Sequence, residues 1–365
     1  MTTMTREDST PDSERTLGEP TEWTRRDLLA IEGLSPSEIR ALLHRTGACD
    51  RSLASGMFPG PPPLAGRSVG TLFFEDSTRT RMSFTQAAQR GGATVIDLSA
   101  KASSVNKGET IVDTALTVES MGVDAVVVRS REAGAAHAIA QAVGCAVLNA
   151  GDGKHEHPTQ ALLDAYTLGL ALAEDGDTRR GLVETDVTTG FDFAGLTVAI
   201  VGDIASSRVA RSNAWCLSAL GARVALVGPA GLAPQAMARL GVNGLVSVER
   251  DFDAVLPEAD AVMMLRIQFE RHGAPTSGAG KGHSPHVPSL REYRGRYGLT
   301  AERAATMKPG APVLHPGPMN RGVEIDGAVC DGPRSLILRQ TSAGVPVRLA
   351  TLASCIDANG GIGPG

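Results

Sequence analysis

Hydroxyl and guanidinium side chains crowd into residues 77–81, which read Ser-Thr-Arg-Thr-Arg after an apolar run. A helix that begins there presents free backbone N–H groups and a partial positive charge, which together favour a phosphate or a similar anion. The hydroxyls of Ser77, Thr78 and Thr80 add donors to such a site. The planar guanidinium of Arg79 can hold two oxygens at once. A single Ser or Thr before a helix is usually only a cap, but this combination favours an anion site.

Further polar groups stand at the ends of predicted strands and the starts of predicted helices. Arg129 follows an apolar run, and His157 precedes Pro158, which suits the first turn of a helix. A histidine in this place can donate to an oxygen that becomes an oxyanion during attack on a carbonyl carbon. Gln160 lies three residues after His157 and on the same side of that first turn, where its amide oxygen can accept a hydrogen bond from an N–H group. Taken singly, each residue is more often a cap, a packing residue or a surface charge.

Two arginines in the second half of the chain, Arg208 and Arg266, could each hold a carboxylate. Both follow predicted strands, at positions where ligands collect in open α/β sheets. We find no Gly-x-Ser-x-Gly or Cys/His arrangement. The sequence therefore gives no indication of a covalent intermediate on the protein.

The order of these segments resembles the aspartate/ornithine carbamoyltransferase family. Residues 77–81 resemble its carbamoyl phosphate site, and residues 157–160 match its His-Pro-x-Gln motif. The matching segments are 77–81, 103–110, 128–129, 157–160, 202–212, 265–271 and 315–322. Their unbroken order, from about residue 27 to about residue 357, is far more specific than any single motif.

The resemblance implies transfer of a carbamoyl group from carbamoyl phosphate to the α-amine of L-aspartate. The products are N-carbamoyl-L-aspartate and phosphate, in de novo pyrimidine biosynthesis. It implies catalytic roles for Arg79, Thr80, Lys107, Arg129 and His157. It implies that carbamoyl phosphate is bound by Ser77, Thr78, Arg79, Thr80, Ser103, Arg129, His157, Gln160, Gly317 and Pro318, and aspartate by Lys107, Arg208, Arg266 and Gln268. It implies neither a cofactor nor a metal ion.

By the same resemblance, Arg208 holds the α-carboxylate of aspartate and Arg266 the β-carboxylate, with Gln268 assisting. Residues 103–110 resemble a loop that the aspartate enzymes send into the active site of a neighbouring subunit. Ser103 and Lys107 would then complete the neighbour's site, and a homotrimer would be the smallest active unit. A regulatory chain or a dihydroorotase partner is compatible with this interpretation.

Three other interpretations stay open. A carbamoyltransferase with another acceptor, such as ornithine or a different amine, would share most of these motifs. Ornithine enzymes, however, have His-Cys-Leu-Pro where this chain has His-Pro-Gly-Pro at 315–318. A catalytically silent scaffold subunit would not need the complete set of motif residues. A nucleotide-binding enzyme is opposed by the lack of Gly-x-Gly-x-x-Gly after any predicted strand.

Composition argues against several classes of function. The formal net charge of −5 is unsuited to coating nucleic acid or an anionic membrane. We find no run of ~20 apolar residues and no signal-peptide pattern, so we expect neither membrane insertion nor export. The five cysteines are scattered and form no Cys-x-x-Cys pair, which indicates a reducing cytoplasm.

Apolar runs and helical patterns alternate and predict an α/β fold of two parallel-sheet domains with an active site between them. Strands are predicted at 69–74, 95–98, 125–128, 146–148, 196–201, 223–227 and 261–265. Helices are predicted from 35, through 82–91, and at 110–121, 133–143, 158–172, 207–220, 234–240 and about 345–356.

The predicted domain organisation begins with a flexible tail at 1–22. A carbamoyl phosphate-binding domain follows at 23–172, and an aspartate-binding domain at 193–344, while the helix at 345–357 returns to the first domain. A loop at 273–288, rich in Gly, Pro and Ser, is predicted to be mobile or to cover the substrate.

Overall fold

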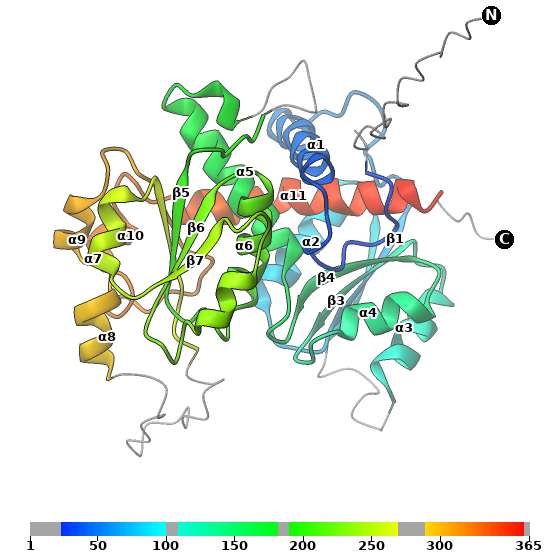
Figure 1. Cartoon of the computed structure of the whole chain (residues 1–365). Helices are drawn as coiled ribbons and strands as arrows, with labels where there is room; N and C mark the ends of the chain where they lie inside the picture. Colours follow the sequence, from blue (N-terminus) through cyan, green and yellow to red (C-terminus); the bar gives the residue numbers. More distant parts are fainter. Residues whose placement is uncertain (1–22, 100–108, 182–189, 269–288, 361–365) are drawn as a thin grey trace, which may run out of the picture.

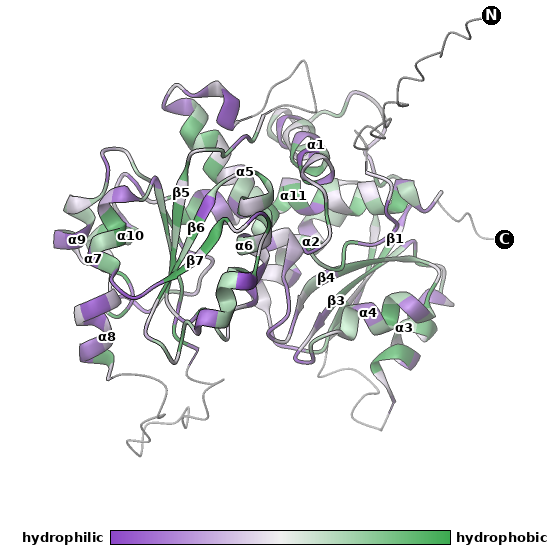
Figure 2. Ribbon diagram, viewed as in Figure 1, coloured by the Kyte–Doolittle hydropathy of each residue, from purple (hydrophilic) through white to green (hydrophobic). Residues whose placement is uncertain are grey.

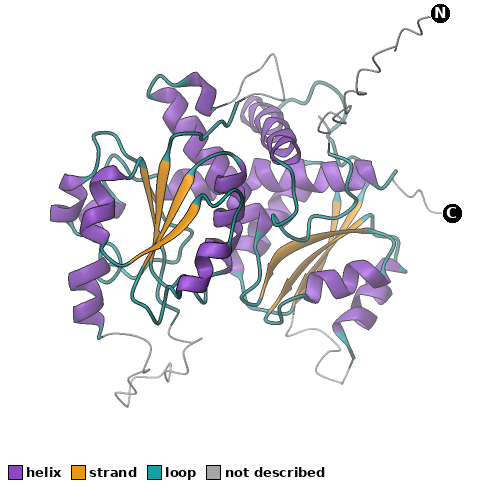
Figure 3. Ribbon diagram, viewed as in Figure 1, coloured by secondary structure: helices purple, strands orange, loops and turns teal. Residues whose placement is uncertain are grey.

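The computed structural model describes residues 23–99, 109–181, 190–268 and 289–360. Two parallel sheets with helices packed around them make up this part of the chain (Figure 1; Figure 3). The predicted α/β fold with two parallel sheets is therefore confirmed. The predicted tail at 1–22 and the predicted loop at 273–288 lie outside the described residues.

The first sheet has the strand order β2-β1-β3-β4, and every neighbouring pair is parallel. The chain places β2 on one side of β1 and β3 on the other, which makes a switch point between β1 and β3. Crevices that hold ligands form at such points, at the carboxyl ends of the strands. The elements of this half are β1 Ser68–Phe73, α2 Thr78–Arg90, β2 Thr94–Ser99, α3 Ile111–Glu119, β3 Ala125–Ser130, α4 Ala135–Ala142 and β4 Ala146–Asp152.

The second sheet repeats the design with the order β7-β6-β5-β8-β9, again wholly parallel. Its switch point lies between β5 and β8. The strands and larger helices are β5 Thr197–Val201, α6 Arg208–Ala219, β6 Arg223–Val227, β7 Val246–Glu249, β8 Ala261–Met264, α8 Leu290–Tyr297, α9 Ala301–Thr306 and β9 Val313–Leu314. Short turns of helix are η2 Thr178–Arg180, η3 Gln235–Arg239, α7 Phe252–Val255, η4 Leu256–Glu258 and α10 Gly327–Cys330.

Three long helices pack together: α1 Pro36–Ser55, α5 Pro158–Glu174 and α11 Ile337–Ala358. The helix α11 packs against α1, α2 and α5, and α5 packs in turn against α6 of the second half (Figure 1). The last helix therefore packs on helices of the first half of the molecule.

Local sequence explains why these helices begin where they do. Ser35 and Glu38 form a reciprocal capping box at the start of α1, and Arg25 donates to the Glu38 carboxylate at 2.5 Å. Such caps satisfy the backbone N–H groups that the first turn leaves without partners. Figure 2 shows hydrophobic residues along the strands, whereas the outer helix α8 is largely hydrophilic. The core therefore lies between the sheets and the helices that cover them.

Two predicted elements need correction. The segment at 234–240 forms the short 3-10 helix η3 rather than an α-helix. The last helix begins at Ile337, eight residues before the predicted start at Val345, and it contains Pro346 in its interior. A proline normally ends or kinks a helix because it lacks an N–H, which is why the sequence favoured a start beside it.

In the described part of the chain, no helix is long and apolar enough to cross a membrane.

Candidate active site

A cavity of about 550 Å³ opens where the carboxyl ends of the two sheets face each other. Residues at or just beyond the carboxyl ends of β1, β3 and β4 line it from the first half, and residues that follow β5, β8 and β9 line it from the second. Its arginines are Arg79, Arg129, Arg208, Arg266 and Arg348. Two acidic residues, Glu75 and Asp76, also line it. This excess of positive charge suits substrates with several negative charges.

The start of α2 at this cavity is left open for an anion. Ser77 is the N-cap residue, yet its side chain makes no capping hydrogen bond, and the first turn carries no acidic residue. Arg79 lies in the same turn, and its pKa is lowered by burial and by the positive charge of Arg266. Gly317 comes so close to Arg79 that a Cβ at this position would collide with the guanidinium. The predicted residues 77–80 and Gly317 are thus brought together around one guanidinium.

A carboxylate links the two halves across the cavity. Glu75, from the turn between β1 and α2, lies 3.0 Å from Nη2 of Arg208, the first residue of α6. The same carboxylate lies 3.5 Å from Nε of Arg129. Arg129 also donates to the carbonyl oxygen of Ala150 at 2.8 Å, and Arg208 to that of Gly153 at 3.2 Å. Two predicted substrate-binding arginines are therefore held in place by one glutamate that bridges the sheets.

His157 is buried at the N-terminus of α5 and lines the cavity. Its backbone N–H donates to Ser212 Oγ at 2.9 Å, and its side chain makes no capping hydrogen bond. Within the described residues, Nδ1 of the imidazole has no hydrogen-bond partner. Burial, followed by the positive charges of Arg129, Arg348 and Arg208, holds the pKa of His157 well below its ordinary value of 6.5. The imidazole is therefore neutral at physiological pH and can donate from one nitrogen only.

Because the folded chain resists protonating His157 while the unfolded chain does not, stability should fall as pH drops below 6.5. This one group should remove about 1.4 kcal/mol for each pH unit below that value, until the lowered pKa is reached. We expect His157→Gln to lose this contribution, so that its free energy of unfolding depends less on pH between 7.5 and 5.5. Urea unfolding of both proteins at these two pH values measures the difference, and equal slopes would contradict a neutral His157.

The second half contributes Arg266 and Gln268, which follow β8. The backbone N–H of Gln268 donates to Asp203 Oδ2 at 3.2 Å, and its side-chain Nε2 donates to the carbonyl oxygen of Ser206 at 3.3 Å. Gln268 is therefore tied to the segment that leads into Arg208. The electrostatic effect of Arg266 on the pKa of Arg79 also indicates that these two arginines face a common space.

Arg348, on α11, is a cavity residue that sequence reasoning missed. Its Nη1 donates to Ser83 Oγ at 2.8 Å, and its guanidinium carbon lies 5.1 Å from the centre of the Phe84 ring. Burial lowers its pKa to about 10, so the side chain is still a cation at neutral pH. The available signal was a single arginine inside an otherwise apolar helical stretch.

Gln160 lies on the first turn of α5, lines the cavity and is 9% exposed. Its Nε2 donates to Asp164 Oδ1 at 2.9 Å. Pro318 also lines the cavity, in the loop that follows β9. The predicted residues Ser103 and Lys107 lie outside the described residues.

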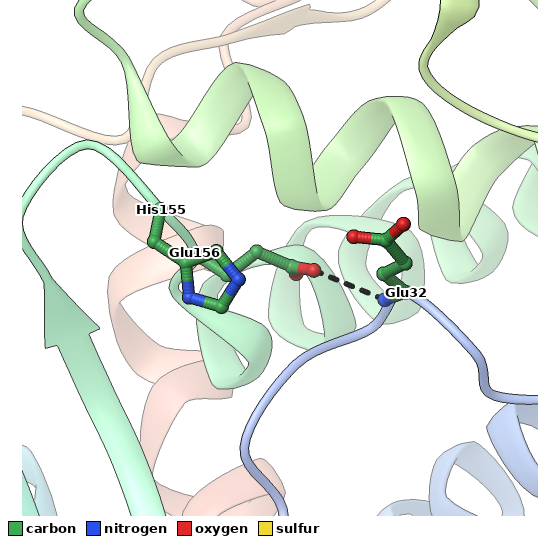
Figure 4. Close-up of side chains that lie close together, drawn as sticks. All are labelled: Glu32, His155 and Glu156. Carbon is green, nitrogen blue, oxygen red and sulfur yellow. Dashed lines mark hydrogen bonds between the residues drawn. The ribbon is translucent and has the colours of Figure 1, made fainter. Parts of the chain in front are cut away.

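A group of possible metal ligands, Glu32, His155 and Glu156, lies beside this site, with ligand atoms within 4.8 Å of one another (Figure 4). The Glu156 carboxylate already accepts hydrogen bonds from the N–H groups of Ile31 at 2.8 Å and Glu32 at 3.0 Å. It also accepts from Ser212 Oγ at 2.7 Å. Glu156 therefore ties the N-terminal segment to α6 directly beside His157, which accounts for its burial without a metal ion.

The two halves of the chain match the models of two protein domains. Residues 26–169 match the model described as "Aspartate/ornithine carbamoyltransferase, carbamoyl-P binding domain". Residues 194–355 match the model described as "Aspartate/ornithine carbamoyltransferase, Asp/Orn binding domain". The chain belongs to the aspartate/ornithine carbamoyltransferase family. The two matches fall on the two sheets, and the cavity lies where the two family domains meet.

Family members of known name cover nearly the whole chain. The aspartate carbamoyltransferase catalytic subunit of Myxococcus xanthus is 48% identical over 334 residues, which is 90% of this chain and 99% of that protein. The corresponding subunit of Salinispora arenicola is 50% identical over 298 residues, with 82% of this chain and 87% of that protein covered.

A solved family structure has the same fold. Aspartate transcarbamoylase from Trypanosoma cruzi, in complex with carbamoyl phosphate and aspartate, is 30% identical to this chain, with a TM-score of 0.75. The similarity covers 92% of this chain and 98% of that one. The same enzyme in complex with N-(phosphonacetyl)-L-aspartic acid gives a TM-score of 0.73, also at 30% identity.

Proposed function

We propose that the chain transfers the carbamoyl group from carbamoyl phosphate to the α-amine of L-aspartate, giving N-carbamoyl-L-aspartate and phosphate. The observation that carries this proposal is the arginine-lined cavity at the junction of the two family domains. One domain is of the carbamoyl phosphate-binding type and the other of the acceptor-binding type. The chain is thus an aspartate carbamoyltransferase enzyme of pyrimidine biosynthesis.

In the first half, carbamoyl phosphate binds at the open N-terminus of α2. The hydroxyls of Ser77, Thr78 and Thr80 and the guanidinium of Arg79 hold the phosphate, because the first turn there offers donors and no negative charge. Pro318 and the backbone at Gly317 close over the same group. These assignments rest on the contact of Gly317 with Arg79 and on the shared cavity.

During transfer, negative charge develops on the carbonyl oxygen and on the departing phosphate. Neutral His157 donates a hydrogen bond to the carbonyl oxygen, and Arg129 and Thr80 stabilise the oxygens on either side. Gln160 accepts from the carbamoyl amino group and orients it. The attacking amine belongs to aspartate, so the protein supplies position and charge rather than a nucleophile.

In the second half, Arg208 holds the α-carboxylate of aspartate and Arg266 the β-carboxylate, with Gln268 assisting. Glu75 lies 3.0 Å from Arg208, which fixes the guanidinium at the edge of the cavity. The two halves therefore bring the amine and the carbamoyl carbon together in one space.

The site is completed by a second subunit in this proposal. Ser103 and Lys107 reach the cavity of a neighbouring chain, and three chains form a closed homotrimer. The enzyme works in the cytoplasm, and a regulatory chain or a dihydroorotase partner is compatible with the trimer. The cysteines of this chain are all free, which agrees with a reducing compartment.

The decisive experiment is an assay of the purified chain for carbamoyl aspartate with carbamoyl phosphate and L-aspartate as substrates. Ornithine is tested in parallel as the acceptor, and the mass in solution is measured at the same time. We expect carbamoyl aspartate to form and carbamoyl ornithine to be absent, because two arginines suit a dicarboxylate and repel a cationic side chain. Product from ornithine alone would overturn the assignment of the acceptor.

A further inference from the structure

Three side-chain amides from three different helices converge on the carboxylate of Asp164. Gln160 on α5 donates from Nε2 to Oδ1 at 2.9 Å, and Gln340 on α11 donates to the same oxygen at 2.7 Å. Asn213 on α6 donates from Nδ2 to Oδ2 at 2.8 Å. Asp164 is 1% exposed, so these bonds are shielded from water. Burial raises its pKa to about 6, and the carboxylate is therefore ionised at neutral pH.

An ionised carboxylate can only accept hydrogen bonds, so each amide must turn its NH2 end toward Asp164. Gln340 supports this orientation independently, because its Oε1 accepts from the backbone N–H of His315 at 2.9 Å. Asn213 is also held twice, since its Nδ2 donates to the carbonyl oxygen of Val209 at 3.1 Å. Within the described residues, the Gln160 side chain makes one hydrogen bond, which is the one to Asp164.

The orientation of Gln160 has a chemical consequence, because Gln160 lines the active-site cavity. With its NH2 end held by Asp164, the end that remains for the cavity is the carbonyl oxygen, an acceptor. An acceptor can pair with the amino group of carbamoyl phosphate. It cannot pair with the methyl group that acetyl phosphate carries in the same place.

We propose that Asp164 is a positioning residue that fixes the Gln160 amide with its oxygen toward the substrate, and so sets the preference for carbamoyl phosphate over acetyl phosphate. This inference rests on the proposed function. Asp164 does not touch the substrate. It acts through Gln160, and the same carboxylate joins α5, α6 and α11 behind the cavity.

The test compares dissociation constants for carbamoyl phosphate and acetyl phosphate, measured by calorimetry with fresh solutions of each. The quantity of interest is the acetyl-to-carbamoyl ratio of these constants. Asp164→Ala leaves room for a water molecule, which can donate or accept and therefore imposes no direction on Gln160. We expect the ratio to fall about tenfold in this variant, the effect of one hydrogen bond in a buried site.

Three comparisons separate positioning from a general loss of structure. Asn213→Ala removes another donor to Asp164 but leaves the bond from Gln160, so its ratio should equal that of the unmodified chain. Gln160→Met removes the acceptor itself and should lower the ratio as far as Asp164→Ala does. In the Gln160→Met background, adding Asp164→Ala should then change the ratio no further.

Circular dichroism and thermal unfolding establish that each variant is folded. If Asp164→Ala does not fold, Asp164→Ser takes its place, since a hydroxyl can also donate or accept and should lower the ratio. An unchanged ratio in the folded variant, or a further fall in the Gln160→Met background, would overturn the proposal. Failure of the unmodified chain to form carbamoyl aspartate would instead overturn the proposed function, so the two failures are distinguishable.

Discussion

Trimers re-formed from a mixture of Lys107→Ala and Arg79→Ala chains should recover carbamoyl transfer activity that neither parent possesses. The reason is that, in the proposed shared site, Arg79 comes from one chain and Lys107 from its neighbour. In a closed ring of three, each hybrid trimer should contain about one intact site in three, because the interface runs head to tail. Activity of the charge-tagged, separated hybrids measures the recovery.

Recovery should require dissociation and reassembly. Simple mixing of the two intact variants serves as the control and should leave both inactive, as should re-formed trimers of either variant alone. If separated hybrids are as inactive as their parents, Lys107 acts within its own chain or is only a solvated loop lysine. This result would remove the shared site while leaving the assignment of Arg79 in place.

Arg266→Ala should raise the KM for aspartate at least about tenfold while it changes carbamoyl phosphate binding little. A charge-assisted hydrogen bond contributes roughly 1.5 to 3 kcal/mol, which corresponds to that factor or more. The positive charge of Arg266 also lowers the pKa of Arg79. Replacing Arg266 by alanine should therefore raise the pKa of Arg79 slightly, and Arg79 stays a cation that can bind the phosphate. Initial rates with each substrate varied in turn measure the two effects.

Arg239→Ala is the matched control for this experiment, because Arg239 is an exposed arginine of the same half that lies outside the cavity. It should leave both constants unchanged. Arg266→Lys should fall between the two, since lysine keeps the charge but loses the two-pronged contact with a carboxylate. Equal weakening of both substrates by Arg266→Ala would contradict the division of labour between the halves.

The residues that the sequence could predict share one property, which is their place beside a strand end or a helix start. Arg79, His157 and Arg208 each stand at the start of a helix at the carboxyl edge of a sheet. In parallel sheets all these edges face the same way, so a pattern of local segments suffices to bring the residues into one cavity. The parallel fold and most of the cavity could be predicted for this reason.

Contacts between distant segments could not be predicted in this way. Gln340 and Asp164 are 176 residues apart in sequence, and no local pattern pairs them. Arg348 sits in a stretch that otherwise reads as core, where a buried cation is unexpected until its partner Ser83 is known. The two ion pairs of Glu75, with Arg129 and with Arg208, depend on how the two halves pack against each other. The spacing of apolar residues along one strand or helix does not predict how the two halves pack.

The position of α11 has a consequence for the order in which the molecule can be built. The ribosome releases the first sheet long before it releases Ile337–Ala358, because the whole second sheet lies between them in the sequence. Yet that last helix brings Arg348 to the cavity and Gln340 to Asp164. During most of translation, the nascent chain therefore contains residues 77–80 at the start of α2 but lacks the residues of α11 that line the same cavity. The complete cavity can form only when synthesis is nearly over.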